Sequence, residues 1–361
     1  MPWPRPGSST AETVTDELAP LLPALQDAGK NSLLVADENL AEGLAAVPDG
    51  QTVLTNRRDL ADQAERRGLP CHFCDFDFSS WPAHSLDAIA YRISKEKAVV
   101  HHIANSAAQR LVPGGRLVLT GAKDEGIKTY AKTIGVLFGD KAVLEKQGKL
   151  YRVTARLASS RRTASPLDDR DYKRLRKILC IDGKPVYSKP GLFGWDKEDA
   201  GSALLAGHLP DFFAARFAVW RRQPIRLLDL GCGYGYLSLQ AAALGIKDIT
   251  ATDNCAAALL ACQHNFREHG IAGRVSASDA GDRLGGSFET IVCNPPFHQG
   301  FARSGGLTDK FLNATRRLLA PGGRALFVVN SFIPLETLAQ RRFAHIATPV
   351  RTGKFKLVEL G

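Results

Sequence analysis

The sequence predicts an α/β protein built from two tandem domains, each with a mostly parallel sheet. Patterns typical of strands and helices alternate in both halves of the chain, as in proteins whose parallel strands are joined by crossover helices. Residues 108–119 are echoed by residues 316–327, each around a Pro-Gly-Gly turn, which indicates an internal repeat. With 361 residues and 44% hydrophobic content, the chain is long enough to bury two cores.

The repeat extends toward earlier strands in both copies. Residues 86–92 align with residues 288–294, and residues 32–39 align with residues 226–233. Each of these segments contains an apolar run of strand length. We therefore expect the same succession of strands in the two domains, as a duplication would produce.

The first copy lacks the small residues that the second copy has at one loop. In this alignment Asp37 and Asn39 replace loop glycines, and Val35 replaces Asp229. A bulky, acidic loop blocks the close approach of the backbone to a ligand that carries a carboxylate. We therefore predict that the first domain is degenerate and that the second domain carries the functional site.

Composition suggests where the domains begin and end. Residues 1–12 are rich in Pro and Ser, and we expect a flexible terminus there. The first domain is expected over residues 13–155 and the second over residues 186–361. Residues 156–185 form a polar and basic linker, in which residues 171–177 are expected to form a short basic helix.

A glycine-rich loop follows the first strand of the second domain. Residues 225–230 form an apolar run that leads into Gly231, Gly233 and Gly235, and residues 236–244 have a helical pattern. Strand, glycine turn and helix in this order are typical of nucleotide-binding α/β folds, where alternate glycines let the backbone pass close to a ligand. The loop alone is a weak signal.

Two acidic residues follow the next two strands. Asp253 follows the strand at residues 248–252, at a spacing that suits a ribose hydroxyl and would also suit NAD. Asp279 follows the strand at residues 274–277 and can reach an adenine amino group. The glycine pattern is GxGxG rather than GxGxxG, which argues against a dinucleotide. Each aspartate has an alternative role as a helix cap or turn former.

The motif Asn294-Pro295-Pro296-Phe297 follows the apolar run at residues 290–293 and predicts an amino-group trap. The lone pair of an amino group conjugated to a ring is delocalised, so the nitrogen is a poor nucleophile. If the Asn294 side-chain oxygen and the Pro295 carbonyl each accept one N–H, the lone pair is aimed outward. Phe297 offers a stacking surface for a flipped base. The alternative is an ordinary turn after a buried strand.

These markers, in this order and followed by a Pro-Gly-Gly turn before a further strand, resemble class I S-adenosylmethionine-dependent methyltransferases. The resemblance implies two tandem Rossmann-like domains of this class, the first one degenerate, and S-adenosylmethionine as cofactor. It implies that Asp229 and the loop of Gly231, Gly233 and Gly235 contact the methionine part, Asp253 the ribose and Asp279 the adenine, with Asn294 also next to the cofactor.

Further segments resemble the RsmC/RlmG family of ribosomal RNA guanine-N2 methyltransferases. They are residues 189–193 (KPGLF), 199–205 (DAGSALL), 294–300 (NPPFHQG) and 352–356 (TGKFK), and the similarity covers residues 185–357. The resemblance implies methyl transfer to a guanine N2 in ribosomal RNA or a ribosomal subunit. Residues 92–97 favour the small subunit and its 16S rRNA. The degenerate domain is then an RNA-binding or stabilising partner.

The net charge of +10 and the sequence pI near 9.3 suit a polyanionic partner, without identifying it as RNA. By the resemblance Phe193 lies in a loop over the cofactor or target base; the alternative is an apolar anchor for that loop. His298 and Arg303 follow the NPPF motif and are candidate RNA contacts. A basic cluster offers a candidate phosphate surface or an ordinary solvated face: Arg161, Arg162, Arg170, Lys173, Arg174, Arg176 and Lys177.

Other classes are disfavoured. The seven cysteines are scattered, and only Cys71 and Cys74 are closely spaced, so no metal site is expected. Neither a signal peptide nor an apolar run of membrane-spanning length is present, so we expect a cytoplasmic protein without a membrane partner. The oligomeric state stays open.

Several alternatives remain open from the sequence. A methyltransferase for a 23S rRNA guanine N2, for an adenine N6 or for the N5 of a protein glutamine would use the same trap, because each target is a planar NH2. A noncatalytic RNA-binding protein of ribosome assembly that keeps the cofactor fold is the other. The basic charge and the duplicated domain disfavour the glutamine reaction, and the intact motifs disfavour the noncatalytic protein.

Overall fold

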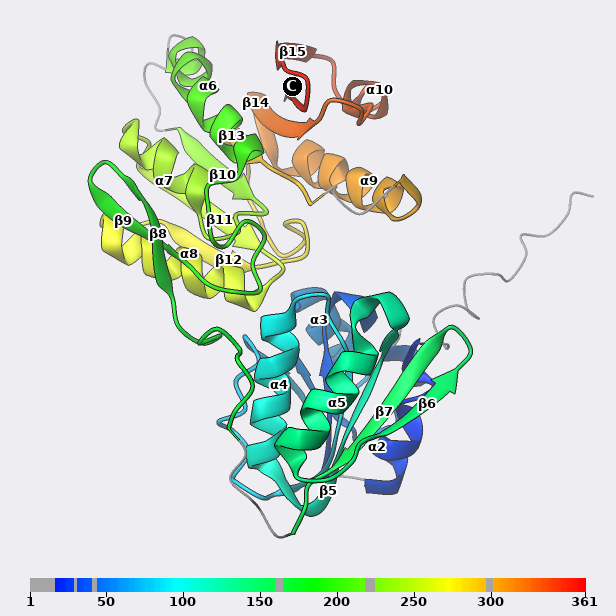
Figure 1. The fold of residues 1–361 in the computed structure, drawn as a ribbon. Coiled ribbons are helices and arrows are strands. Elements are labelled where there is room, and N and C mark those ends of the chain that lie inside the picture. The colour runs from blue at the N-terminus through cyan, green and yellow to red at the C-terminus, as the bar shows by residue number, and fades with distance from the viewer. Residues whose placement is uncertain (1–16, 29–30, 41–43, 160–164, 218–224, 297–300) are drawn as a thin grey trace, which may run out of the picture. The chain divides into compact units, whose positions relative to one another are not determined.

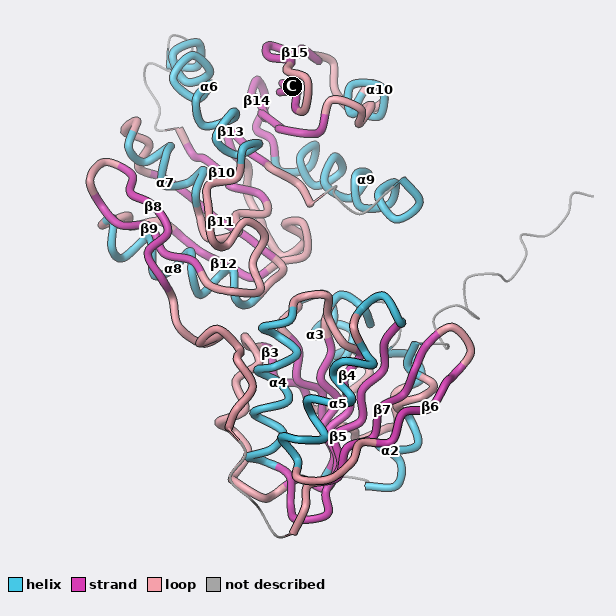
Figure 2. The backbone as a smooth tube through the Cα atoms, in the orientation of Figure 1, coloured by secondary structure: helices cyan, strands magenta, loops and turns pink. Residues whose placement is uncertain are grey.

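The computed structural model describes residues 17–28, 31–40, 44–159, 165–217, 225–296 and 301–361, with the side chains of residues 216–217 and 301–305 left out. The chain divides into two compact units, Met1–Tyr172 and Lys173–Gly361. The boundary falls inside the expected linker. Figures 1 and 2 show a layered α/β unit on each side of it.

The amino-terminal unit contains a seven-stranded sheet in the order β3-β2-β1-β4-β5-β7-β6. The strands are β1 (Ser32–Ala36), β2 (Thr52–Thr55), β3 (Cys71–Phe73), β4 (Leu86–Arg92), β5 (Leu111–Ala122), β6 (Val143–Gln147) and β7 (Leu150–Arg156). Strands β1 to β5 run parallel, whereas β7 is antiparallel to both β5 and β6. The helices are α2 (Leu22–Ala28), α3 (Arg58–Arg66), α4 (Lys97–Arg110) and α5 (Ile127–Phe138), with short 3₁₀ turns η2 (Glu38–Leu40), η3 (Leu44–Ala46) and η4 (Lys123–Glu125).

The carboxyl-terminal unit contains a second seven-stranded sheet in the order β12-β11-β10-β13-β14-β16-β15. Its strands are β10 (Arg226–Leu230), β11 (Asp248–Asp253), β12 (Arg274–Ala277), β13 (Phe288–Cys293), β14 (Leu319–Asn330), β15 (Ile346–Arg351) and β16 (Phe355–Leu360). Its helices are α6 (Ala200–Phe217), α7 (Tyr236–Ala243), α8 (Ala256–His269), α9 (Phe301–Leu318) and α10 (Leu335–Ala339), and a hairpin of β8 (Arg176–Ile181) and β9 (Lys184–Ser188) precedes them.

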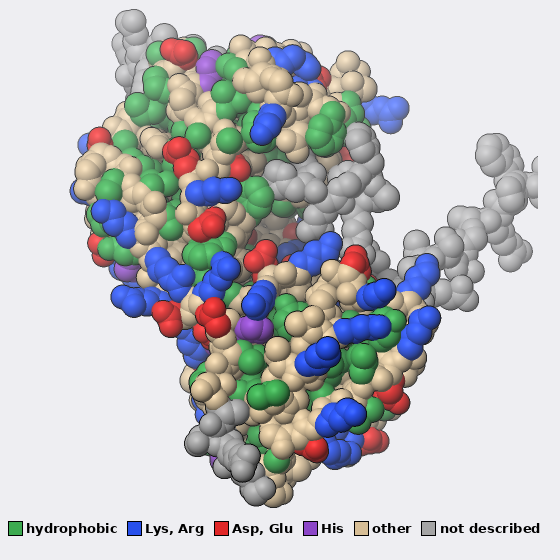
Figure 3. Space-filling view, in the orientation of Figure 1, with side chains coloured by type: hydrophobic (Ala, Val, Ile, Leu, Met, Phe, Trp, Pro, Cys, Tyr) green, Lys and Arg blue, Asp and Glu red, His purple; other side chains and the backbone are tan. Residues whose placement is uncertain are grey.

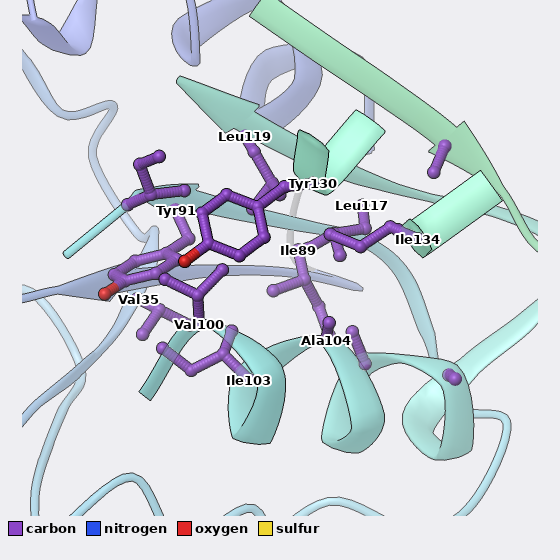
Figure 4. Packing of buried hydrophobic residues seen from close by; sticks show 14 of the residues in the cluster. Val35, Ile89, Tyr91, Val100, Ile103, Ala104, Leu117, Leu119, Tyr130 and Ile134 are labelled. Carbon is purple, nitrogen blue, oxygen red and sulfur yellow. The ribbon is translucent and has the colours of Figure 1, made fainter. Parts of the chain in front are cut away.

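The two sheets have the same order once each strand of the first is matched with its counterpart in the second. The prediction of two Rossmann-like α/β domains is confirmed. Helices cover both faces of each sheet, so alternate strand residues are buried on opposite sides. Figure 4 shows one such layer, where Val35, Ile89 and Tyr91 pack against α4 and α5.

The register corrects the predicted alignment of the first strands by one residue. Ile89 pairs with Leu33 in the first sheet, and its counterpart Ile291 pairs with Leu228 in the second. Leu33 and Leu228 therefore correspond, and Leu34, not Val35, stands at the place of Asp229. A shift of one residue reverses the face on which each side chain lies. All five residues of β1 are buried, so no alternation of apolar and polar residues indicates which face each side chain occupies. The sequence therefore could not fix this register.

The expected basic helix at residues 171–177 is wrong. Residues from Arg176 onward form β8, which pairs with β9 across the turn at Asp182 and Gly183. These two residues have φ of 52° and 74°, as a two-residue turn of type I′ requires. The Asp-Gly pair between two apolar segments is the sequence signal for this hairpin. No helix within the described residues is long and apolar enough to cross a membrane.

Candidate active site

Asp229, the glycine loop, Asp253, Asp279 and Asn294 lie at the carboxyl ends of the strands of the second sheet. Strands β11, β10 and β13 are adjacent and parallel, so the segments that follow them emerge side by side. The chain runs from β10 through β11 to β12 on one side of β10 and then crosses to the other side to form β13, which makes β10 and β13 the switch point of the sheet. Ligands of open α/β sheets bind at the carboxyl ends of the strands at such a point.

The glycine loop has a backbone that requires glycine. Gly231, Gly233 and Gly235 have φ of 80°, 53° and 90°, in the left-handed region. The backbone N–H groups of Gly231 and Cys232 donate to the carbonyl of Thr252 at 2.9 and 3.0 Å, which fastens the loop to β11. A Cβ on Gly235 would lie 2.8 Å from the sulfur of Cys262, so α8 packs directly on the loop.

Asp253 joins the glycine loop to the start of α8. Its Oδ2 accepts the N–H of Gly233 at 2.9 Å, and its Oδ1 accepts the N–H of Cys255 at 2.9 Å. A carboxylate has about four acceptor positions, so a carboxylate that caps a helix can also accept a ligand hydroxyl. The helix-capping role and the ligand-binding role are therefore compatible at this residue.

Asp229 is buried at the end of β10, with one oxygen occupied and one not. Its Oδ2 accepts the N–H and the hydroxyl of Ser238 on α7, at 3.0 and 2.7 Å. Its Oδ1 has no hydrogen-bond partner among the described residues. Burial raises the pKa of Asp229 to about 7, and the charge of Asp253 adds to this effect. A buried acceptor without a donor is costly unless a ligand supplies one.

Asp279 lies between two residues that the sequence analysis did not identify. The Asn254 side chain donates to its Oδ1 at 3.4 Å, and Lys310 on α9 forms an ion pair with its Oδ2. Asn254 directly follows Asp253, and this adjacency is a sequence signal for it. Nothing near Lys310 in the sequence indicates the contact, because α9 reaches Asp279 only in the folded sheet.

Asn294 directly follows β13 and faces the start of α6. Its side-chain NH2 donates to Asp199 Oδ2 at 2.9 Å and to Ser202 Oγ at 2.8 Å. Asn294 is half-buried and Pro295 is buried. Asp199 and Ser202 lie in the segment that carried the family resemblance, but the sequence assigned no role to either of them.

The remaining candidates lie in other segments of the chain, some of them outside the described residues. Phe193 is 62% exposed, whereas the preceding Leu192 is buried. Arg174 and Lys177 are exposed at the start of the β8–β9 hairpin. Phe297 and His298 lie outside the described residues, as does the side chain of Arg303, whose backbone belongs to α9.

A glycine loop at the switch point, acidic residues after consecutive strands and an Asn-Pro-Pro segment after β13 are the arrangement of class I methyltransferases. Residues 183–359, nearly all of the carboxyl-terminal unit, match the family described as "Methyltransferase small domain". The carboxyl-terminal unit is therefore a methyltransferase domain.

Similar proteins extend over both units. A protein of Shewanella loihica named "Ribosomal RNA small subunit methyltransferase C" is 26% identical over 337 residues, covering 91% of this chain and 93% of its own. A protein of Actinobacillus succinogenes with the same name is 27% identical, covering 78% and 80%. The predicted resemblance to the RsmC/RlmG family is confirmed.

A solved structure shows the same fold over the whole chain. It is described as a T. thermophilus 16S rRNA N2 methyltransferase (RsmC) in complex with AdoMet and guanosine. The TM-score is 0.78 at 24% identity, and the match covers 100% of this chain and 97% of the other. The tandem arrangement of two such units is thus shared with that protein.

Proposed function

We propose that this protein transfers a methyl group from S-adenosylmethionine to the exocyclic N2 amino group of a guanine in 16S rRNA of the small ribosomal subunit. The observation that carries the proposal is the side chain of Asn294. Both of its N–H groups are occupied, by Asp199 and Ser202, which leaves its oxygen to accept a hydrogen from the target amino group. The names of the similar proteins support the choice of the RNA.

The residues present fit S-adenosylmethionine. The unpartnered Oδ1 of Asp229 can accept a hydrogen from the α-ammonium group of the methionine part, and the loop from Gly231 to Gly235 lets the backbone approach it. Asp253 is assigned to the ribose hydroxyls, and Asp279 is assigned to the adenine amino group. The cofactor supplies an electrophilic methyl group on a sulfonium.

The trap itself needs no general base. Asn294 Oδ1 and the Pro295 carbonyl each accept one N–H of the guanine amino group, and the nitrogen lone pair then points toward the methyl group. The base must leave its stack to reach Asn294, and Phe297 is assigned to stack on it. We assign three further residues to contacts with the RNA near the target base: His298, Arg303 and Phe193.

The degenerate unit is assigned to RNA binding through a lysine group, defined as Lys123, Lys128, Lys146 and Lys149. These side chains are exposed, and two of them lie at Tyr151: Lys146 pairs with it across β6 and β7, and the Lys128 ammonium lies 4.9 Å from its ring centroid. Leu150 pairs with Ala122, which places Lys149 and Lys123 at the same end of the sheet.

None of the four lysines forms an ion pair with a described residue, whereas the neighbouring Arg152 pairs with Glu145. Asp124, Asp140 and Glu145 are exposed acidic residues between them in sequence. Figure 3 shows Lys and Arg side chains gathered over α5 and the β6–β7 hairpin. Unpaired lysines suit phosphates, because neutralising phosphates releases counterions from RNA. Arg174 and Lys177 are assigned to the same partner.

The test is transfer of tritium from labelled S-adenosylmethionine to purified small subunits, large subunits and their naked RNAs, followed by nucleoside analysis. The expected product is N2-methylguanosine from the small subunit or its RNA. Label in large-subunit RNA would move the assignment to that RNA, and labelled N6-methyladenosine would move it to an adenine N6. Label in protein alone would indicate a glutamine methyltransferase, and no label in any fraction would favour a noncatalytic protein.

A further inference from the structure

Asp199 and Asn294 are 95 positions apart in sequence and form a hydrogen bond at the carboxyl end of β13. Asp199 precedes α6 as its capping residue: its Oδ2 accepts the N–H of Ser202 at 2.8 Å, and its carbonyl accepts the N–H of Ala203 at 2.8 Å. The same Oδ2 accepts a hydrogen from the Asn294 side chain at 2.9 Å. The hydrogen bonds to α6 therefore hold the Asp199 carboxylate in place next to the Asn294 amide.

A carboxamide can fit one cavity in two orientations, because its oxygen and its NH2 group have nearly the same size. A carboxylate only accepts hydrogen bonds, so the Asn294 NH2 group must face Asp199. The hydroxyl of Ser202, 2.8 Å from the same nitrogen, can donate or accept and so tolerates both orientations. Of these two partners, Asp199 alone distinguishes them.

We infer that Asp199 is a positioning residue that fixes the orientation of the Asn294 amide and so turns its oxygen toward the target amino group. The inference rests on the proposed function for what the oxygen accepts. In the reversed orientation the NH2 of Asn294 would face the NH2 of the base, and two donors cannot form the trap. The electron pair of the target nitrogen would then stay delocalised in the ring.

The packing around Asp199 leaves little freedom. A Cβ added to Gly201 would lie 3.1 Å from Asp199 Oδ2 and 3.3 Å from the ring of Phe355. Both groups can approach this closely because Gly201 has no side chain. The neighbouring Glu198 accepts a hydrogen from the Tyr236 hydroxyl at 2.5 Å and does not contact Asn294 in the described residues. Glu198 therefore offers a control for the loss of one negative charge at this place.

The experiment compares Asp199→Ser with Glu198→Gln in the full chain. Ser caps a helix about as well as Asp does, so α6 is retained, but its hydroxyl can donate or accept, so a serine at 199 tolerates either orientation of Asn294. We expect Asp199→Ser to lower kcat for methylation of small subunits about 100-fold, because misplacing one reacting group costs that much. Affinity for S-adenosylmethionine by calorimetry and the melting temperature should stay unchanged. Glu198→Gln should retain kcat within about twofold.

A second readout does not need methyl transfer. With 15N-labelled asparagine, the side-chain NH2 of Asn294, identified by its loss in Asn294→Ala, should exchange slowly with solvent in the natural protein and faster in Asp199→Ser. A wild-type kcat in Asp199→Ser, or equal exchange in the two proteins, would overturn the inference. A loss of cofactor affinity as large as the loss of kcat would assign Asp199 to cofactor binding instead. If the natural protein labels no RNA, the proposed function fails, and the exchange rates still decide the contact.

Discussion

Asp37 in the amino-terminal unit and Asp229 in the carboxyl-terminal unit are both buried carboxyl groups whose pKa is raised by burial to about 7. Their surroundings differ. Asp37 is satisfied within its own unit, since Oδ2 accepts the Tyr91 hydroxyl at 2.7 Å and Oδ1 accepts the backbone and side-chain N–H groups of Asn39, each at 2.9 Å. Asp229 keeps one oxygen without a partner among the described residues.

Tyr91 supplies a hydrogen bond to Asp37 that Asp229 lacks in the second unit among the described residues. By the pairing with β5 and β14, Tyr91 stands where the second unit has Cys293. Its ring is buried, and its hydroxyl accepts the N–H of Ser94 at 3.0 Å besides donating to Asp37. The corrected register puts Leu34 in place of Asp229, and Arg92 stands in place of Asn294 as the repeat predicted. One fold thus satisfies both oxygens of a buried carboxyl group in the first unit and leaves one oxygen without a described partner in the second.

The strongest test of this difference is Asn294→Ala. Turnover should fall by about a factor of 1000 or more, because the acceptor of the trap is lost, at the upper end of what removing one catalytic hydrogen-bonding group costs. Affinity for S-adenosylmethionine, measured by calorimetry, should change little. A fully active Asn294→Ala protein would remove the trap from the mechanism and erase the main difference between the units.

The second prediction separates RNA binding from catalysis. Replacing Lys123, Lys128, Lys146 and Lys149 by Gln should weaken binding of small-subunit RNA about 100-fold at moderate salt and flatten its salt dependence, because each phosphate contact contributes about one unit of slope. Cofactor affinity should be unchanged. The matched variant with four Arg should keep the affinity, and an unchanged salt slope in the Gln variant would exclude this surface.

The third prediction uses the pKa of Asp229, which rises from 3.8 to about 7 on folding. In the proposed binding mode ionised Asp229 pairs with an ammonium group, so affinity for S-adenosylmethionine should increase about tenfold between pH 6 and pH 8, as the carboxyl group loses its proton. Titration calorimetry checks it. Asp229→Asn should abolish the increase and retain only the titration of the ligand amine, whereas Asp37→Asn should leave it intact.

The same raised pKa affects stability in the opposite direction. A carboxyl group whose folded-state pKa is raised contributes stability that is full below its unfolded pKa and is lost as pH rises through the folded pKa. The ligand-free protein should therefore lose part of its stability between about pH 4 and pH 7, in unit 1 through Asp37 and in unit 2 through Asp229. Saturating cofactor should restore the contribution of Asp229 only, which thermal melts at several pH values can show.

The smallest effect is expected for Tyr91→Phe. This change removes the hydroxyl that donates to Asp37 and leaves a buried acceptor unpaired, which costs about 1–3 kcal/mol. It should lower the melting temperature of the protein without changing cofactor affinity. A matched Tyr236→Phe, which removes a hydroxyl that donates to the exposed side chain of Glu198, should cost less.

The sequence predicted the fold and the strands of the site because its signals there are local. The Pro-Gly-Gly repeat, the glycine loop and the strands before Asp253, Asp279 and Asn294 each occupy a few consecutive residues. Contacts such as Asp199 with Asn294 or Lys310 with Asp279 join residues that only the sheet order brings together, and no local pattern indicates them. The one-residue error at Leu34 arose where all neighbours are buried and the face of the strand cannot be inferred from alternation.

The shared sheet order has a consequence for how the chain reaches its folded state. Strands such as β1 and β10 have equivalent neighbours in two sheets, so during folding each has a second, wrong place to pair, and tandem repeats misassemble in this way. Synthesis from the amino terminus completes the 172 residues of the first unit before β10 emerges. We therefore expect a higher yield of folded protein from translation than from refolding of the urea-unfolded full chain, and equal yields would contradict this. The duplication that supplied a partner unit also made the order of synthesis part of correct assembly.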